Sequence, residues 1–315
     1  MKKHNIIAMA LTSLMALPVI AQDSTPAVGD ILQGINMFTP EEGDPAYKVK
    51  ANEKYGTQWG VDMAYGLWNT EKVSDVKRHN NLALLHAQLN QRLIEDKANG
   101  GTWLRVEFSG SWGLDRESAQ SDTFFTEAYA TASGLHADAM GPHEGIFPEV
   151  ALMQYFAGKR ACLIAGMVNL TNYFDAVSIA NDSFSSFTND GFVNSTILPL
   201  VDSNIGGILQ VELNRNNYMM VAVSRTGCDS GYNPFNSDYC DGYAVVGEYG
   251  HIFADGAATL RINPFYTSTD VDMDDGTGER RRQNAGLVAS IEYTPCDPLT
   301  IYSRAGFAAK QYLSN

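Results

Sequence analysis

Arginine, carboxylate, amide and indole side chains recur at alternate positions of several polar–apolar segments in this chain of 315 residues. Planar charged and amide groups can make paired hydrogen bonds to vicinal hydroxyls, and an aromatic face can cover an apolar C–H surface. These groups would suit a polyhydroxylated solute; the alternative is a wet surface whose charges only balance one another. The candidate residues are Trp103, Arg105, Glu107, Glu149, Arg261, Asn263 and Arg304. Arg105 and Glu149 are the strongest candidates because each interrupts an apolar or small neighbourhood.

The segments that carry these residues have the period-two pattern of β-strands. In the segment 102–113, apolar residues at 104, 106, 108 and 112 alternate with polar residues at 105, 107, 109 and 111. The pattern predicts about eleven strands: 57–69, 81–94, 102–113, 146–156, 161–169, 204–214, 217–226, 242–253, 258–269, 283–294 and 299–312.

The connections between these strands alternate strictly between short and long along the chain. The short ones are 95–101, 157–160, 215–216, 254–257 and 295–298, and the long ones are 70–80, 114–145, 170–203, 227–241 and 270–282. A transmembrane β-barrel sorts its connections in this way, with tight periplasmic turns at one end and long external loops at the other. We therefore expect an all-β, antiparallel transmembrane β-barrel over 57–315, with an apolar outer face and a polar inner face. Aromatic residues near the strand ends fit interfacial girdles.

Composition removes several classes of protein. The chain is 44% hydrophobic and only 18% charged, which excludes a disordered chain. Its net charge of −14 disfavours a nucleic-acid partner. A basic start, an apolar run over 6–19 and small residues before position 22 predict a secretory signal peptide over 1–21, followed by a periplasmic N-terminal segment over 22–56.

Three stretches together resemble the carbohydrate-selective porin family typified by OprB. They are the hairpin 147–169 (FPEVALMQYF, then LIAGMVN), the loop with YFD at 173–175 and FSSFTN at 184–189, and the return LP at 198–199 to NIGG at 204–207. An upstream stretch from Asn81 to Phe108 also resembles this family. The resemblance covers residues 57–312 and implies a sixteen-stranded barrel for passive diffusion of mono- or oligosaccharides. Its partners would be these sugars and the lipid and lipopolysaccharide of a Gram-negative-type outer membrane, as a monomer or a homo-oligomer.

Two departures from that family follow from the sequence. Family members run well past 400 residues, and this chain ends on Tyr-Leu-Ser-Asn rather than on an aromatic residue. We expect a C-terminal truncation of a longer barrel, with a smaller or a multi-chain barrel as alternatives.

The long connection 170–203 is the expected constriction, because it is rich in Phe and Asn and follows a strand on the external side. Its candidate residues are Phe174, Asp175, Phe184, Phe187 and Asn189. A disulfide is expected between Cys228 and Cys240, which bracket another external loop in an oxidising compartment. Whether Cys162 pairs with Cys296 stays open.

No nucleophile-elbow, zinc-protease or phosphate-loop motif is present in the sequence, so we expect neither an enzyme nor a cofactor. The acidic run 270–279 lacks the glycine of a calcium loop, and no metal is expected. The competing hypothesis is a secreted or surface-exposed all-β carbohydrate-binding protein without a pore.

Overall fold

The computed structural model describes residues 45–69, 79–113, 144–178, 194–201, 203–226, 242–272, 280–296 and 299–309. Twelve strands form a single sheet in which every neighbouring pair is antiparallel. The strands are β1 (Thr57–Asn69), β2 (His79–Ile94), β3 (Thr102–Gly113), β4 (Glu144–Ile146), β5 (Val150–Phe156), β6 (Ala161–Val168), β7 (Asn204–Asn214), β8 (Asn217–Thr226), β9 (Gly242–Phe253), β10 (Ala258–Asp272), β11 (Arg280–Cys296) and β12 (Leu299–Ala308). Their spatial order follows the chain, apart from the short β4, which pairs with β3.

The eleven expected strands are present, and the expected strand 146–156 is split. Both β4 and β5 pair with β3, and residues 147–149 separate them. Pro148 lies in this break and has no N–H to offer a ladder. A backbone hydrogen bond still joins β3 to this break, because Glu107 N donates to Glu149 O at 2.8 Å. The break therefore leaves Glu149 beside β3 with its side chain fully buried.

Burial on the sheet is the reverse of that in a water-soluble protein. The outward rows are apolar and exposed, with Met63 at 81% and Phe307 at 70%. The inward rows hold buried polar residues, with Arg105 at 1% and Glu149 at 0%. Along β5 exposure alternates at every residue. A soluble domain seldom buries charged groups. A membrane barrel, in contrast, presents apolar side chains to lipid on its outer face and polar side chains to its interior. The expected assignment of faces is confirmed.

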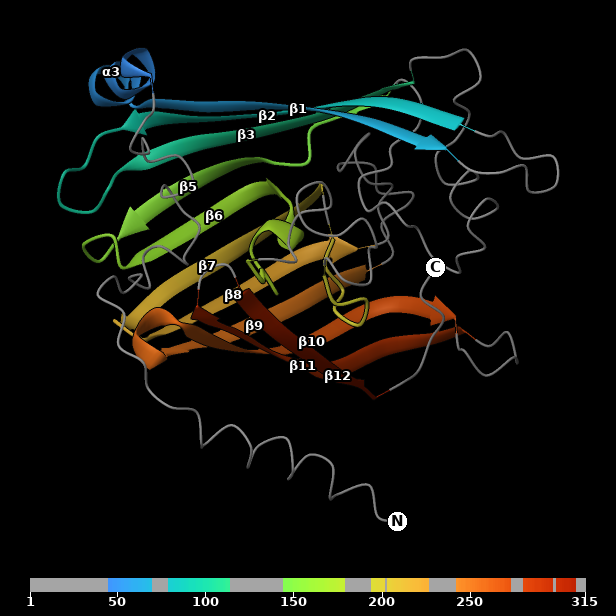
Figure 1. The fold of residues 1–315 in the computed structure, drawn as a ribbon. Helices are drawn as coiled ribbons and strands as arrows, with labels where there is room; N and C mark the ends of the chain where they lie inside the picture. The colour runs from blue at the N-terminus through green and yellow to red at the C-terminus, as the bar shows by residue number, and fades with distance from the viewer. Residues whose placement is uncertain are drawn as a thin grey trace.

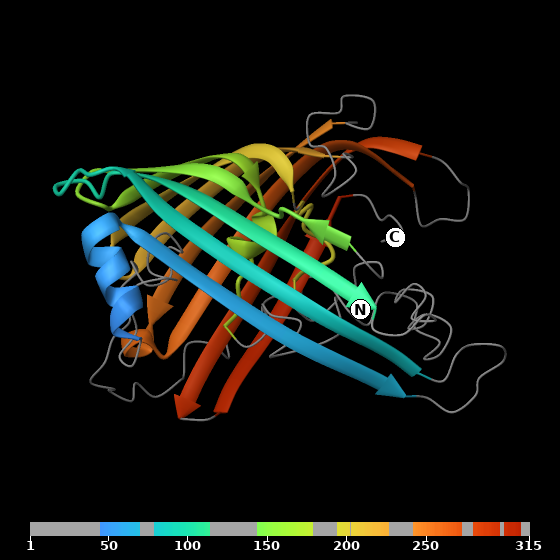
Figure 2. The ribbon, with the colours of Figure 1, turned by 90° about the horizontal axis from the view of Figure 1, so that it is seen from above.

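The sheet curves so that β1–β3 lie across the interior from β10–β12 (Figure 1). In the described part of the chain β1 and β12 are not paired with each other, so the sheet is open there. The described short connections, including the one that holds the 3-10 turn η5 (Ala254–Gly256), lie at one end (Figure 2). We call it the short-turn end. None of the described helices is both long and apolar enough to span a membrane.

A helix, α3 (Ala46–Tyr55), precedes β1 and was not expected from the sequence. It has no buried residue, so it leaves no apolar periodicity to detect. It ends at Gly56, whose left-handed conformation (φ 64°) closes the helix by donating from its N–H to Asn52 O at 2.9 Å. The helix falls within residues 22–56, for which the sequence predicts a periplasmic N-terminal segment.

Candidate functional site

The connection after β6 turns into the interior of the curved sheet. We call residues Asn169–Ser178 the inner segment; it contains the 3-10 turn η3 (Leu170–Asn172). Asn169 caps the turn, since its Oδ1 accepts from Thr171 N at 3.1 Å and from Thr171 Oγ1 at 2.6 Å. Leu170 and Phe174 are fully buried in the same apolar cluster as the inward-facing Ile164 and Ile208. The inner segment therefore packs against the inner face of β6 and β7 at this level.

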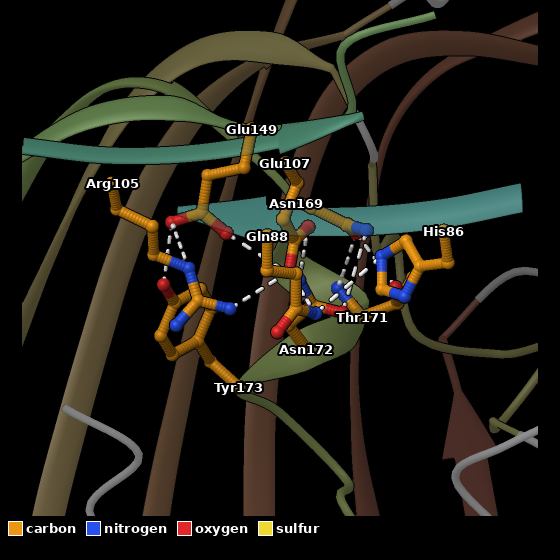
Figure 3. A network of polar contacts seen from close by, with 9 residues as sticks. All are labelled: His86, Gln88, Arg105, Glu107, Glu149, Asn169, Thr171, Asn172 and Tyr173. Carbon is orange, nitrogen blue, oxygen red and sulfur yellow. Dashed lines mark hydrogen bonds and ion pairs between the residues drawn. The ribbon is translucent and has the colours of Figure 1, made fainter. Parts of the chain in front are cut away.

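The first half of the inner segment binds a cluster of polar residues on β2, on β3 and in the break between β4 and β5, shown in Figure 3. We call it the proximal cluster: Gln88, Arg105, Glu107, Glu149, Asn172 and Tyr173. Tyr173 Oη donates to Glu149 Oε1 at 2.5 Å. Asn172 Nδ2 donates to Glu107 Oε2 at 2.9 Å and to Glu149 Oε2 at 3.4 Å. Asn172 and Tyr173 thus hold two carboxylates, one on β3 and one in the break between β4 and β5.

The carboxylates of the proximal cluster share one guanidinium. Arg105 Nη2 lies 2.8 Å from Glu107 Oε1, and its Nε lies 3.5 Å from Glu149 Oε1. The Arg105 guanidinium also stands 5.7 Å from the centre of the Tyr173 ring. Gln88 Nε2 adds a hydrogen bond of 3.0 Å to Glu107 Oε1. Burial raises the pKa of Tyr173 well above 10.0, although the charge of Arg105 opposes that rise. The phenol therefore stays protonated and remains a donor to Glu149.

The second half of the inner segment binds the opposite wall. We call this set the distal cluster: Asp175, Tyr218, Glu248, Asn263 and Arg304. Asp175 N donates to Glu248 Oε2 at 2.9 Å. Tyr218 Oη and Asn263 Nδ2 each donate to Glu248 at 2.7 Å. Arg304 reaches inward from β12, with its Nη2 2.9 Å from Asp175 Oδ2. Four strands therefore converge on two residues, Asp175 and Glu248.

Asp175 combines an unusual backbone conformation with a buried charge. Its φ of 56° is left-handed, a region that Asp tolerates better than most residues. Ser195 N donates to its Oδ2 at 2.7 Å from the returning chain. Burial raises the pKa of Asp175 above its ordinary value, and the positive charge of Arg304 opposes that rise. The ion pair thus offsets part of the cost of placing a carboxylate in the interior.

A third contact fixes the end of the inner segment. Both Ser178 N, at 3.1 Å, and Ser178 Oγ donate to Glu292 Oε1 on β11. Arg261 Nη1 on β10 neutralises the same carboxylate from 3.2 Å. Along its ten residues the inner segment therefore bridges the interior, from β3 and the break before β5 to β9, β11 and β12.

The inner segment and the side chains that it contacts include more acidic than basic groups. The five carboxylates are Glu107, Glu149, Asp175, Glu248 and Glu292, and the three guanidiniums are those of Arg105, Arg261 and Arg304. Among the residues that the structure describes, no three His, Cys, Asp or Glu are grouped to hold a metal ion. The arrangement can narrow a passage and present polar groups to a solute.

The structure divides the predicted residues among the two polar clusters, the Arg261–Glu292 ion pair and the apolar cluster. Arg105, Glu107 and Glu149 lie in the proximal cluster, Asp175, Asn263 and Arg304 in the distal cluster, and Arg261 beside Glu292. Trp103 faces inward as part of the apolar cluster, and its Nε1 donates to Gly100 O at 2.9 Å. Phe174 is buried in the apolar cluster. Phe184, Phe187, Asn189, Cys228 and Cys240 lie outside the described residues. Cys162 and Cys296 are both free thiols.

The sequence analysis did not single out Asn172, Tyr173, Tyr218 or Ser178. Tyr218 shares the period-two face of Met220 and Ala222, so its inward direction could have been deduced. Asn172, Tyr173 and Ser178 lie in a connection without periodicity. Their roles depend on which wall the connection meets, and no local pattern gives that.

An antiparallel meander with an exposed apolar outer face, a buried polar inner face and a connection folded into its interior has the wall architecture of a porin-type β-barrel. Among solved structures, the chain is similar to OprB of Pseudomonas putida at high pH, with a TM-score of 0.58 and 12% identity over 87% of this chain and 68% of that one. The expected likeness to OprB is thereby confirmed at the level of the fold.

Similarity to other known proteins is weak or absent. The chain also aligns with a mutant of Rh. blastica porin at 11% identity, over 79% of this chain and 94% of that one, but the TM-score of 0.24 is too low to support an argument. No family model and no curated protein matches the sequence.

Proposed function

We propose that this chain forms the wall of an outer-membrane porin through which mono- or oligosaccharides diffuse passively. The observation that carries the proposal is the pairing of an exposed apolar outer face with a buried polar interior bridged by the inner segment. The first feature suits lipid, and the second narrows an aqueous path. The fold shared with OprB supports the same conclusion.

The mechanism is passage beside the inner segment and involves no chemical step. Arg105, Glu107 and Glu149 are buried and paired with one another and with the segment, so their main role is to hold Asn172 and Tyr173 in place. Gln88 and Asn172 are only half-buried and, with the half-buried His86 beside Gln88, form the accessible edge of the proximal cluster. A sugar would exchange its hydrogen bonds with water for bonds to this edge. Selectivity thus comes from geometry and hydrogen bonding.

Planar-bilayer recording of the purified full chain tests the proposal. We expect discrete conductance steps, and we expect maltose or glucose to reduce the current more than an equal osmolarity of betaine does. Steps that no sugar alters would leave a general porin and remove the carbohydrate selectivity. Absence of any step would remove the porin itself.

The same proposal places the chain in lipid, in contact with outer-membrane phospholipid and lipopolysaccharide. We expect it to need detergent for extraction and to migrate on SDS gels at a position that changes on boiling. A chain that stays in the aqueous fraction and migrates identically with and without boiling would favour the surface carbohydrate-binding alternative.

A further inference from the structure

The helix α3 carries an excess of positive charge in a strongly acidic chain. Its ten residues include Lys48, Lys50 and Lys54 against one acidic residue, Glu53, whereas the whole chain has a net charge of −14. Lys50 and Lys54 are exposed. Among the described residues none of the three lysines is joined to a carboxylate. Their charges are therefore available to a partner.

The helix does not owe its position to apolar packing, because none of its residues is buried. Hydrogen bonds at its C-terminal end hold it instead. Arg92 N donates to Gly56 O at 2.8 Å, and Gln91 Nε2 donates to Tyr55 O at 3.0 Å. Gln58 Nε2 reaches Asn52 Oδ1 at 3.3 Å. The lysines are thus presented by a helix anchored to β1 and β2 at the short-turn end (Figures 1 and 2).

Aromatic rings lie close to two of the three lysines. Lys48 Nζ stands 4.8 Å from the Trp59 ring centre, and Lys54 Nζ stands 4.8 Å from that of Tyr55. Tyr47 stacks on Trp59 with centroids 6.2 Å apart. Trp59 belongs to the outward row of β1 that continues through Val61, which is 52% exposed. The lysine–aromatic set therefore borders the surface that faces lipid.

We propose that α3, with Tyr47, Tyr55 and Trp59, is a docking surface for the anionic headgroups of phospholipids in the leaflet at the short-turn end. We call this set the basic collar; the proposal rests on the membrane placement given under the proposed function. Tyr and Trp favour the interface between hydrocarbon and headgroups. Each lysine near an anionic membrane surface contributes about 1 kcal/mol of attraction.

The position of the collar favours lipid over a soluble polyanion. Its aromatic rings continue the lipid-facing row, so a headgroup bound there keeps its acyl chains against apolar wall residues. The helix itself has no apolar face to insert, so contact stays at headgroup level. With the rest of the chain strongly acidic, the collar is a local complement to an anionic bilayer.

Lipid binding to the purified full chain in detergent tests the collar. The probes are phosphatidylglycerol and phosphatidylcholine, and the readout is the number of lipids retained in native mass spectrometry together with the dissociation constant from a titration. We expect phosphatidylglycerol to be preferred in a salt-sensitive manner. The double variant Lys48→Gln/Lys54→Gln should weaken that binding by about fivefold for each lysine removed. Trp59→Leu should have an intermediate effect.

The matched control removes two exposed turn lysines at the same end, Lys97→Gln/Lys159→Gln. Equal losses in both double variants would overturn the collar in favour of a general charge effect. Equal retention of the two lipids would also overturn it, as would lysine-dependent sedimentation with peptidoglycan in the absence of a lipid preference. Conductance in pure phosphatidylcholine bilayers should be unchanged in Lys48→Gln/Lys54→Gln. A lipid preference in a chain without conductance would leave the collar standing and remove only the porin proposal.

Discussion

Arg304 and Asp175 are 129 residues apart in the sequence, and the Nε of Arg304 donates to Asp175 Oδ1 at 3.2 Å inside the curved sheet. A second contact of 2.9 Å joins Nη2 to Oδ2, so the pairing is bidentate. Arg304 lies on β12, whereas Asp175 belongs to a connection that leaves β6. The pair therefore fixes the inner segment to the far end of the meander, whereas Tyr173 fixes it to Glu149 in the break between β4 and β5.

Arg304→Gln should release the distal end of the inner segment. Asp175 is fully buried and the Arg304 side chain is 11% exposed, so the variant leaves a buried carboxylate without its guanidinium. We expect a loss of about 3–5 kcal/mol in the free energy of unfolding, together with a larger and noisier single-channel current. Urea unfolding and bilayer recording measure the two effects. Ser303→Ala, on the outward face of the same strand, should change neither; a quiet, unchanged current in Arg304→Gln would refute the restraint.

Tyr173→Phe should weaken the proximal end without leaving a cavity. The variant removes the O–H that donates to Glu149, a hydrogen bond to a charged group that contributes about 1.5–3 kcal/mol. We expect the urea midpoint to fall and the block by maltose to weaken. Phe147→Leu, at an exposed position near the same carboxylate in sequence, is the control and should leave both unchanged.

Alkaline pH should detach the same end of the segment only above the ordinary range of tyrosine. The pKa of Tyr173 is raised above 10.0 by burial, so the neutral phenol is favoured in the folded chain. Its contribution to stability is complete below about pH 10 and is lost as pH rises through the raised pKa. Current recorded from pH 8 upward should stay steady through pH 10 and become noisy above it. Tyr173→Phe should show no such step, and a step of equal size in that variant would assign the effect to another group.

Arg105 should stabilise the fold mainly by neutralising the carboxylates of Glu107 and Glu149. Arg105→Met alone leaves Glu107 and Glu149 buried around Asn172 without a positive charge, at a cost of about 3–5 kcal/mol. The triple variant Arg105→Met/Glu107→Gln/Glu149→Gln removes the uncompensated charges and should recover much of that stability. Thermal unfolding of the two variants gives the comparison. Equal destabilisation would show that Arg105 acts through packing and not through charge.

The sequence predicts the strands of the β-sheet but not the contacts of the inner segment. Strand positions, their order and the two faces follow from period-two patterning, as the half-buried Leu104 and the buried, inward Arg105 illustrate. The helix α3 has no buried face and so gave no signal. The contacts of Tyr173 and Asp175 depend on how the inner segment crosses the interior, a property of the tertiary structure. Sequence placed Asp175 in a constriction but could not pair it with Arg304.

The expected disulfide between Cys228 and Cys240 stays a prediction, since both residues lie outside the described part of the chain. Peptide mapping of the exported, non-reduced chain should recover these two cysteines linked. Cys296 is exposed and should react with a maleimide in the folded chain, whereas the buried Cys162 should react only after unfolding. Recovery of a Cys162–Cys296 link would contradict the free thiols seen here.

A side chain at Gly250 should be destabilising, because the ring of Tyr218 lies against this position. A Cβ at this position would stand 2.0 Å from Cε1 and Cζ of Tyr218, whose Oη donates to Glu248. Gly250→Ala must displace that ring, so we expect an overpacking cost of about 1–3 kcal/mol and loss of one donor to the carboxylate that accepts from Asp175 N. The distal end of the inner segment should loosen, and the current should become noisier. Gly207→Ala meets only Ile164 O at 3.4 Å and should be tolerated. If both alanine variants unfold at the wild-type urea concentration, Tyr218 has room to move and does not position Glu248.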